Sequence, residues 1–428
     1  SSSLRRLRRG AGMRYSAAFP APPYTSTPLE PRADATLKSD AQVIGLVGFA
    51  HSLSHFYQLA LPPLFPLIRA EFDVSWSLLG SLVGVFYVAS GFAQFSSGFA
   101  VDRFGARPVL FGGLALLGGG ALAAGVVPGI GWLFPVVAIM GVGNGVFHPV
   151  DFAILNANVA PRRLGHAYSA HGIGGNLGYA AAPIAMFGLA SIIGWRGALL
   201  AAGVMGLVGL GILMTQRARL TCHVGRGRAA SPAKAITLFR QPAILACFAY
   251  FAVATTAATG LQTFSPAALN AAFDVPLALA TSAVTALLLG GAAGIVAGGF
   301  LAARTTRHDR VAAIGLAVAA ALLVVITFAG SSVAWVLPLF AAAGFASGAT
   351  GPSRDMIVRT AAPDGAAGRV YGFVYSGLDL GAAVGPVWFG FMLDHRQGDA
   401  IFLAAAACFV VAIATVMQVR RSRIAHAT

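Results

Sequence analysis

Charged side chains are scarce in this sequence of 428 residues. Only 10% of the residues are Asp, Glu, Lys or Arg, whereas 57% are hydrophobic. A soluble protein of this length needs far more charged surface, so the composition excludes a water-soluble globular domain. Apolar segments of about twenty residues recur through the chain and are too long and continuous for barrel strands. The sequence therefore predicts an all-α polytopic membrane protein.

Cysteine and nucleotide-binding motifs are equally sparse. The three cysteines, Cys222, Cys247 and Cys408, have no paired spacing, which argues against a disulfide framework or a cysteine metal signature. The chain has no G-x-x-x-x-G-K-[ST] loop, so ATP hydrolysis is not expected. His51 and His55 have a metal-ligand spacing, but no third ligand is evident. We therefore expect neither a cofactor nor a metal ion.

The acidic residues are few, 14 against 29 Lys and Arg, which gives a formal net charge of +15. If the N-terminus is cytoplasmic, all Lys and Arg except Arg69, Arg196 and Arg396 fall on the cytoplasmic side of the predicted spans or in their cytoplasmic halves. The basic excess thus indicates topology rather than nucleic-acid binding. The predicted spans are 42–67, 77–100, 108–127, 132–158, 165–191, 196–215, 243–267, 277–302, 311–330, 333–358, 369–392 and 400–418.

The polar segments divide the chain into five parts. We expect a disordered cytoplasmic tail at 1–40, a six-helix bundle at 41–215, a cytoplasmic linker at 216–241, a second six-helix bundle at 242–419 and a cytoplasmic tail at 420–428. This organisation places both termini in the cytoplasm and the chain in the inner membrane as a multi-pass protein. We expect a monomer.

The two halves repeat each other. Residues 143–183 align without a gap with residues 346–386, and the identical positions include Pro149/Pro352 and Pro183/Pro386. Many carriers contain such repeats in one membrane chain, with the substrate site near mid-membrane between the halves. The sequence thus predicts two pseudo-symmetric bundles around a central cavity.

The loop between the second and third predicted spans, "GFAVDRFGARPVL", carries a specific motif. Its Gly98, Asp102, Arg103, Gly105 and Arg107 are similar to the Gly-x-x-x-Asp-Arg-x-Gly-x-Arg signature of the major facilitator superfamily. The "GNGVFHP" and "GGNLG" segments further resemble the fosmidomycin-resistance-like branch. The resemblance implies a twelve-helix transporter, not an enzyme, in which this loop acts as a conformational latch on the cytoplasmic side.

Three positions depart from the patterns expected of this superfamily. Val150 separates Pro149 from the acid that follows it, Ala303 replaces the acid in the second copy of the loop, and Val137 replaces the arginine of proton/drug antiporters. The resemblance to the fosmidomycin-like branch favours efflux, whereas the missing arginine disfavours ordinary drug antiport.

Polar side chains within the predicted spans are the candidate site. Such groups are costly in a bilayer and by default indicate function. They concentrate on the helices that line or flank the central cavity in the superfamily. The candidate cavity residues are His51, His55, Gln58, Asn144, His148, Asp151, His171, Asn176, Gln262, Arg354, Tyr375 and Asp379.

Asn144, His148 and Asp151 follow the spacing i, i+4, i+7, which predicts one stripe on a helix that Pro149 kinks. Asp151 and Arg354 occupy equivalent positions in the repeat. We hypothesise that this carboxylate and this guanidinium approach each other in one state of the transport cycle and separate in another.

These observations predict a secondary transporter that works by alternating access and is coupled to protons. Its partners are a small solute, protons and the bilayer. The candidate proton carriers are Asp151, Asp379, His148 and His171, since buried carboxylates and imidazoles can titrate near neutral pH. Several imidazoles and Arg354 favour an anionic organic solute. The alternatives are a drug or fosmidomycin-like efflux antiporter, an intramembrane enzyme and a non-transporting receptor.

Overall fold

The computed structural model describes residues 36–220, 239–329, 333–361 and 367–427. These residues form helices and no strand. The N-terminal half contains α1 (Leu37–Gln58), η1 (Pro62–Leu64), α2 (Phe65–Phe72), α3 (Trp76–Phe104), α4 (Ala106–Gly125), η2 (Ile130–Trp132), α5 (Leu133–Gly145), α6 (Phe147–Asn158), η3 (Pro161–Arg163), α7 (Leu164–Thr215) and η4 (Arg217–Arg219). The C-terminal half contains α9 (Pro242–Phe273), α10 (Leu277–Arg304), α11 (His308–Ala329), α12 (Val333–Gly348), α13 (Gly351–Ala361), α14 (Ala367–Asp394) and α15 (Ala400–Ala427).

The helices account for twelve spans. Ten segments of the described chain are long and apolar enough to cross a membrane, and one of them, Pro161–Thr215, has 55 residues. That segment covers two spans, because α7 turns a corner at Gly194, where φ is 71°. The remaining span is α1, whose His, Ser and Gln side chains lower its hydropathy. The predicted fold class is confirmed.

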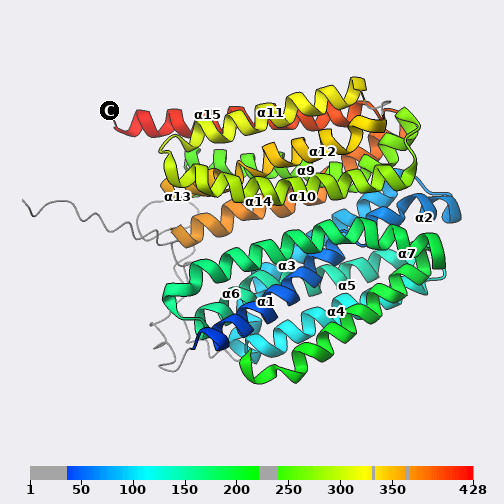
Figure 1. The fold of residues 1–428 in the computed structure, drawn as a ribbon, viewed down its shortest axis with the longest axis horizontal. Helices are drawn as coiled ribbons and strands as arrows, with labels where there is room; N and C mark the ends of the chain where they lie inside the picture. The colour runs from blue at the N-terminus through cyan, green and yellow to red at the C-terminus, as the bar shows by residue number, and fades with distance from the viewer. Residues whose placement is uncertain (1–35, 221–238, 330–332, 362–366, 428) are drawn as a thin grey trace, which may run out of the picture.

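The two halves form separate bundles that lie side by side, with α3, α7, α10 and α14 between their centres (Figure 1). The largest contacts between the halves join α3 to α14 and α7 to α10. The predicted bundles therefore meet along a join that four helices build.

The fourth span of each half is broken at an equivalent place. In the N-terminal half α5 ends at Gly145 and α6 begins at Phe147, two residues before Pro149. In the C-terminal half α12 ends at Gly348 and α13 begins at Gly351, next to Pro352. A proline has no N–H to donate and its ring clashes with the preceding turn. The first break lies beside the kink that the sequence predicts at Pro149, and the second lies beside the equivalent Pro352.

The first helix and the last helix extend beyond the predicted bundle boundaries. Helix α1 begins at Leu37 because the Thr36 side chain caps it, accepting a hydrogen bond from the Ser39 N–H. Asp40, placed in the tail by the sequence, is wholly buried. Helix α15 continues to Ala427, past the boundary at residue 419. Most of the predicted N-terminal tail and linker lies outside the described residues.

The join is closed at one end. The Asp394 carboxylate accepts hydrogen bonds from the backbone N–H groups of Trp76 (2.7 Å) and Ser77 (2.9 Å) at the start of α3, and from the Ser77 hydroxyl. A carboxylate is stabilised at a helix N-terminus by the free N–H groups and the helix dipole. The Phe264 ring of α9 packs against Phe65 and Trp76 at the same end. These contacts fasten the C-terminal half to the start of α3.

The contact between α3 and α14 ends partway along α3. Gly80, Gly84 and Gly91 all face α14, where a Cβ on Gly80 would lie 2.3 Å from the Pro386 carbonyl oxygen. Phe95 and Phe99 follow Gly84 by about three and four helical turns, so they continue this face. They are nevertheless 84% and 73% exposed. The half of α3 that leads to the Gly98–Arg107 loop therefore stands away from the other bundle.

Candidate functional site

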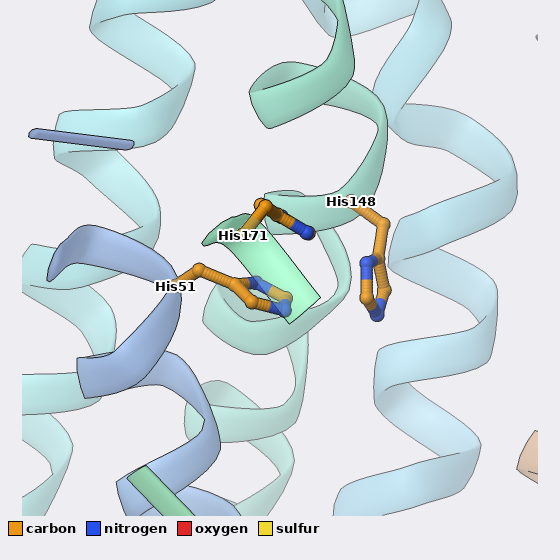
Figure 2. Close-up of side chains that lie close together, drawn as sticks. All are labelled: His51, His148 and His171. Atoms are coloured by element: carbon orange, nitrogen blue, oxygen red, sulfur yellow. The ribbon is translucent and has the colours of Figure 1, made fainter. Parts of the chain in front are cut away.

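Four histidines surround one aspartate inside the N-terminal bundle. The packing brings together His51 and His55 from α1, His148 and Asp151 from α6, and His171 from α7. The break before α6 begins a new helix on which His148 and Asp151 are three residues apart and share a face. Figure 2 shows the imidazoles of three of these residues lying close together.

Asp151 is the centre of this histidine cluster. Its Oδ2 lies 3.0 Å from His171 Nε2 and 3.2 Å from His51 Nδ1, and the carboxylate is wholly buried. The imidazoles of His51 and His171 stack with their centroids 3.6 Å apart. His148 is exposed, whereas His51 and His171 are buried. The cluster is therefore buried at His51, His171 and Asp151 and reaches the surface of the structure at His148.

Gly175 makes room for the cluster. A Cβ on this residue would lie 2.9 Å from atoms of both His51 and His55. Real Cβ atoms do not approach other atoms this closely, so a side chain on this turn of α7 would displace the imidazoles. The "GGNLG" segment therefore contributes space for histidines.

A second polar network adjoins the cluster and centres on Asn144. The Asn144 Oδ1 atom accepts hydrogen bonds from Ser54 Oγ (2.8 Å) and Gln58 Nε2 (3.0 Å), and Asn144 Nδ2 donates to Ser90 Oγ (2.9 Å). Gln58 Oε1 accepts from the hydroxyls of Tyr87 and Tyr179. This network joins α1, α3, α5 and α7.

The helix break changes one prediction. Asn144 lies on α5 and His148 and Asp151 on α6, so the predicted single stripe is divided between two helices and two networks. The networks meet where the His55 ring packs on Tyr179, with centroids 4.3 Å apart.

Arg354 lies on α13 in the C-terminal half. Its Nε donates to Asp355 Oδ1 at 3.0 Å, and its guanidinium lies over the Phe251 ring at 4.5 Å. The Tyr375 hydroxyl of α14 donates to the same Asp355 oxygen at 3.1 Å. In this conformation Arg354 is therefore paired with its neighbour, and Asp151 with histidines. The hypothesised approach of Asp151 to Arg354 stays a prediction for another state.

Asp379 lies at the join. Atoms of its half-buried side chain would be 3.4 to 3.6 Å from a Cβ built on Gly91 of the other half. Asn176 of α7 and Gln262 of α9 both line a cavity of about 140 Å³ whose other walls come from α10, α11, α12 and α15. Three predicted residues thus reach the region where the halves meet.

The Gly98–Arg107 segment, which the sequence predicts as a loop, is helical except at Gly105, because α3 continues to Phe104 and α4 begins at Ala106. It lies at the open end of the join. Gly105 ends α3 with a φ of 84°, a conformation that favours glycine. Arg107 Nη1 donates to the Arg217 carbonyl oxygen at 3.3 Å, which ties the loop to the end of its own bundle. Asp102 and Arg103 are exposed. The latch role predicted for this loop is not tested by this conformation.

The structure thus brings the predicted residues into several groups rather than one. Sequence reasoning missed the partners Ser90, Tyr87, Tyr179 and Asp355 as site residues. Serine and tyrosine are inexpensive in membrane helices, so their presence gives little signal. All four nevertheless lie on spans that line or flank the cavity in the superfamily.

Two bundles of six membrane helices, joined along four helices and carrying polar groups on both sides of the join, define a membrane carrier. The sequence pattern of the Major Facilitator Superfamily matches residues 46–270 and, a second time, residues 251–426. The chain belongs to this superfamily of transporters, and the family predicted from the loop motif is confirmed. It is a multi-pass membrane protein of a family that moves small solutes and is not enzymatic.

Two curated relatives align with parts of the chain. The fosmidomycin resistance protein of Escherichia coli (strain K12) is 25% identical over 142 residues, which cover 33% of this chain and 35% of that protein. The probable L-galactonate transporter of the same strain is 26% identical over 205 residues, which cover 48% of this chain and 45% of that protein. The chain therefore aligns with less than half the length of either relative.

The fold is similar to that of a solved transporter. A bacterial homolog of the human lysosomal transporter Spinster, in an inward-facing and occupied conformation, superposes with a TM-score of 0.73. The match covers 90% of this chain and 98% of the other, at 16% sequence identity. At that identity the likeness concerns the fold alone.

Proposed function

We propose that this chain is a secondary active transporter that moves a small organic anion across the inner membrane by alternating access, driven by the proton gradient. The observation that carries the proposal is the half-open join. Helix α3 packs on α14 at one end, and the continuation of the same face, at Phe95 and Phe99, is exposed at the other. A carrier that rocks its halves requires such a face, covered in one state and uncovered in another.

The distribution of basic residues supports an orientation. Cytoplasmic loops of membrane proteins are enriched in Lys and Arg. The Gly98–Arg107 loop, with Arg103 and Arg107, lies at the open end of the join. With this end in the cytoplasm, both termini are cytoplasmic and the conformation described is inward-facing. Asp394 and the start of α3 then close the path on the opposite side.

Arg354 supports an anionic solute. Its Nε is engaged by Asp355, and its terminal nitrogens make no hydrogen bond within the described residues. These two nitrogens form a fork that matches the two oxygens of a carboxylate. One relative, the probable L-galactonate transporter, is named for the transport of a sugar acid, which is also a carboxylate. A small carboxylate is the substrate class that this chemistry favours.

Asp379 is the proton carrier that we propose among the predicted candidates. A coupling group must experience different surroundings in the two states, so that its proton affinity changes with the conformation. Asp379 meets Gly91 of the other half across the join, and separation of α3 from α14 would therefore uncover it. Asp151, by contrast, has its contacts within one bundle.

The proposal is tested with purified protein in liposomes. A thermal-shift screen of organic carboxylates and phosphonates first identifies a solute, and its flux is then measured with and without an imposed pH gradient. We expect the gradient to accelerate flux in the parent protein. Asp379→Asn should remove this acceleration but retain solute counterflow, because counterflow needs alternating access without net proton movement.

Asp399→Asn is the matched control, since Asp399 is an exposed acid of the same half. Solute flux that ignores the gradient in the parent protein would contradict proton coupling. An unchanged gradient response in Asp379→Asn would contradict the assignment of the carrier. The direction of solute flux relative to the imposed pH gradient distinguishes uptake from the alternative of drug or fosmidomycin-like efflux. Solute binding without any counterflow would identify a non-transporting receptor.

A further inference from the structure

The histidine cluster contains a set of metal-ligating atoms that the proposed transport mechanism does not use. One nitrogen from each of His51, His148 and His171 lies within 4.8 Å of the corresponding nitrogens of the other two (Figure 2). These residues come from α1, α6 and α7, so the arrangement is a product of the packing rather than of one helical repeat. It supplies the third ligand that the sequence alone does not reveal.

Asp151 adds an oxygen to these nitrogens. Its Oδ2 lies 3.2 Å from His51 Nδ1 and 3.0 Å from His171 Nε2. In a tetrahedral zinc site with bonds of about 2.0–2.1 Å, neighbouring ligand atoms are separated by about 3.3 Å. Small side-chain rotations would therefore suffice for one ion to bind these three atoms, and His148 is placed to complete the set.

Three buried polar atoms of the cluster have no hydrogen-bond partner, and two of them, His51 Nδ1 and Asp151 Oδ1, belong to these ligands. His51 Nδ1 is close to the Asp151 carboxylate but not in hydrogen-bonding geometry, and Asp151 Oδ1 is likewise unpartnered. His51 is 2% exposed and Asp151 is fully buried. Leaving such atoms without a partner is costly, and each has a lone pair that a cation would satisfy.

We propose that His51, His148, His171 and Asp151 bind one divalent transition-metal ion of the Zn²⁺ type. Three imidazoles and one carboxylate form a donor set of intermediate softness, which suits Zn²⁺ and Co²⁺ better than Mg²⁺ or Ca²⁺. The exposed His148 gives the ion a route to the buried ligands. All four ligands belong to one bundle, so the ion would stay bound while the halves rock. The inference does not depend on the transported solute.

The test is metal binding by the full chain in detergent, after treatment with a chelator and removal of any affinity tag. Zn²⁺ is titrated by calorimetry, and Co²⁺ is titrated by its visible absorption, which is intense when the ion is tetrahedral. We expect one ion per chain. His148→Asn and His171→Asn should each weaken binding by at least about tenfold, as the loss of site residues generally does.

His166→Asn is the matched control, because His166 is an exposed histidine on α7 outside the cluster. It should bind the ion as the parent protein does. A thermal unfolding curve of each variant without metal identifies any variant that fails to fold; His148→Asn, at the exposed position, carries the least risk.

X-ray absorption of the Zn²⁺ complex gives an independent readout. Three imidazoles and one oxygen in the coordination shell would support the site. A shell of oxygen atoms alone would overturn the proposal, as would the lack of stoichiometric binding in the parent protein. Binding that is unchanged in both His148→Asn and His171→Asn would also overturn it. No measurement of transport enters the test, so its failure leaves the proposed function unaffected.

Discussion

At the scale of single residues, the buried carboxylate of Asp40 anchors the first helix to the segment between α6 and α7. It accepts hydrogen bonds from Arg163 Nε at 2.6 Å and from the Ala160 N–H at 3.0 Å. Asp40 is fully buried and the Arg163 side chain is 15% exposed. Removing one partner of a buried pair leaves the other charge uncompensated, so such pairs are sensitive to substitution.

We predict that Asp40→Asn and Arg163→Gln each lower the free energy of unfolding by about 3–5 kcal/mol, the cost of removing one partner of a buried ion pair. The double variant should lose less than the sum of the two, since the first change already removes the interaction. Apparent unfolding midpoints of the four proteins in one detergent measure this coupling. Additive losses would show that the pair contributes no interaction of its own.

Asp40 also shows what the sequence could not reveal about single residues. Its acid group lies next to an Arg- and Ser-rich segment, where it is indistinguishable from a solvated charge. The polar groups of the cluster were predictable because each lies inside an apolar span, where an ionisable side chain has a clear cost. That His51, His148 and His171 touch one another depends on how α1, α6 and α7 pack, which no local pattern encodes.

At the scale of helices, each half uses the same close contact around its broken span. A Cβ on Gly145 would lie 2.2 Å from the Ser90 carbonyl oxygen of α3, and one on Gly348 would lie 2.2 Å from the Gly291 carbonyl oxygen of α10. Gly141 and Gly344, one turn earlier, are equally crowded. These Gly-x-x-x-Gly pairs occupy equivalent positions in the repeat, and small residues allow membrane helices to approach closely.

We therefore predict that Gly145→Ala forces α5 away from α3 and destabilises the fold by about 1–3 kcal/mol, as overpacking typically does. Gly119→Ala is the control, because a Cβ on this residue of α4 meets nothing within 4 Å. Apparent unfolding midpoints should fall for Gly145→Ala and stay unchanged or rise for Gly119→Ala. Equal effects of the two substitutions would contradict the packing argument.

The helices themselves were largely predictable. Long apolar runs determine the spans, and Pro149 and Pro352 give the place of the breaks because the chemistry of proline is local. The consequence of the first break was not predictable. It separates Asn144 from His148 and Asp151, and directs them into different networks, although their spacing on an unbroken helix indicates one stripe.

At the scale of the whole molecule, the repeat predicts two bundles but not the state in which they are found. That choice depends on small differences between the contacts made at the two ends of the join. In the state described, Asp394 binds the N-terminus of α3, and Phe95 and Phe99 are exposed. If Asp394 stabilises this state and not the other, weakening its contacts must shift the population toward closure at the Phe95 end.

The last prediction tests this shift with a disulfide reporter. Successive contacts of Gly80, Gly84 and Gly91 with Pro386, Ala383 and Asp379 run in opposite directions along α3 and α14. Their continuation brings Phe95 opposite the exposed Ser376 once the open end closes. In a chain without its three native cysteines, Phe95→Cys with Ser376→Cys should cross-link only in the closed-end state. Adding Asp394→Asn should raise the rate of cross-linking about 5- to 30-fold, which corresponds to the loss of about 1–2 kcal/mol of charge-assisted hydrogen bonding.

Asp73→Asn is the control, because Asp73 is an exposed acid near the same end of the join. Its backbone has a left-handed conformation, which asparagine also tolerates. A cross-linking rate that Asp394→Asn leaves unchanged would mean that this carboxylate holds the two halves equally well in both states, and that the preference for opening at the Phe95 end originates elsewhere along the join.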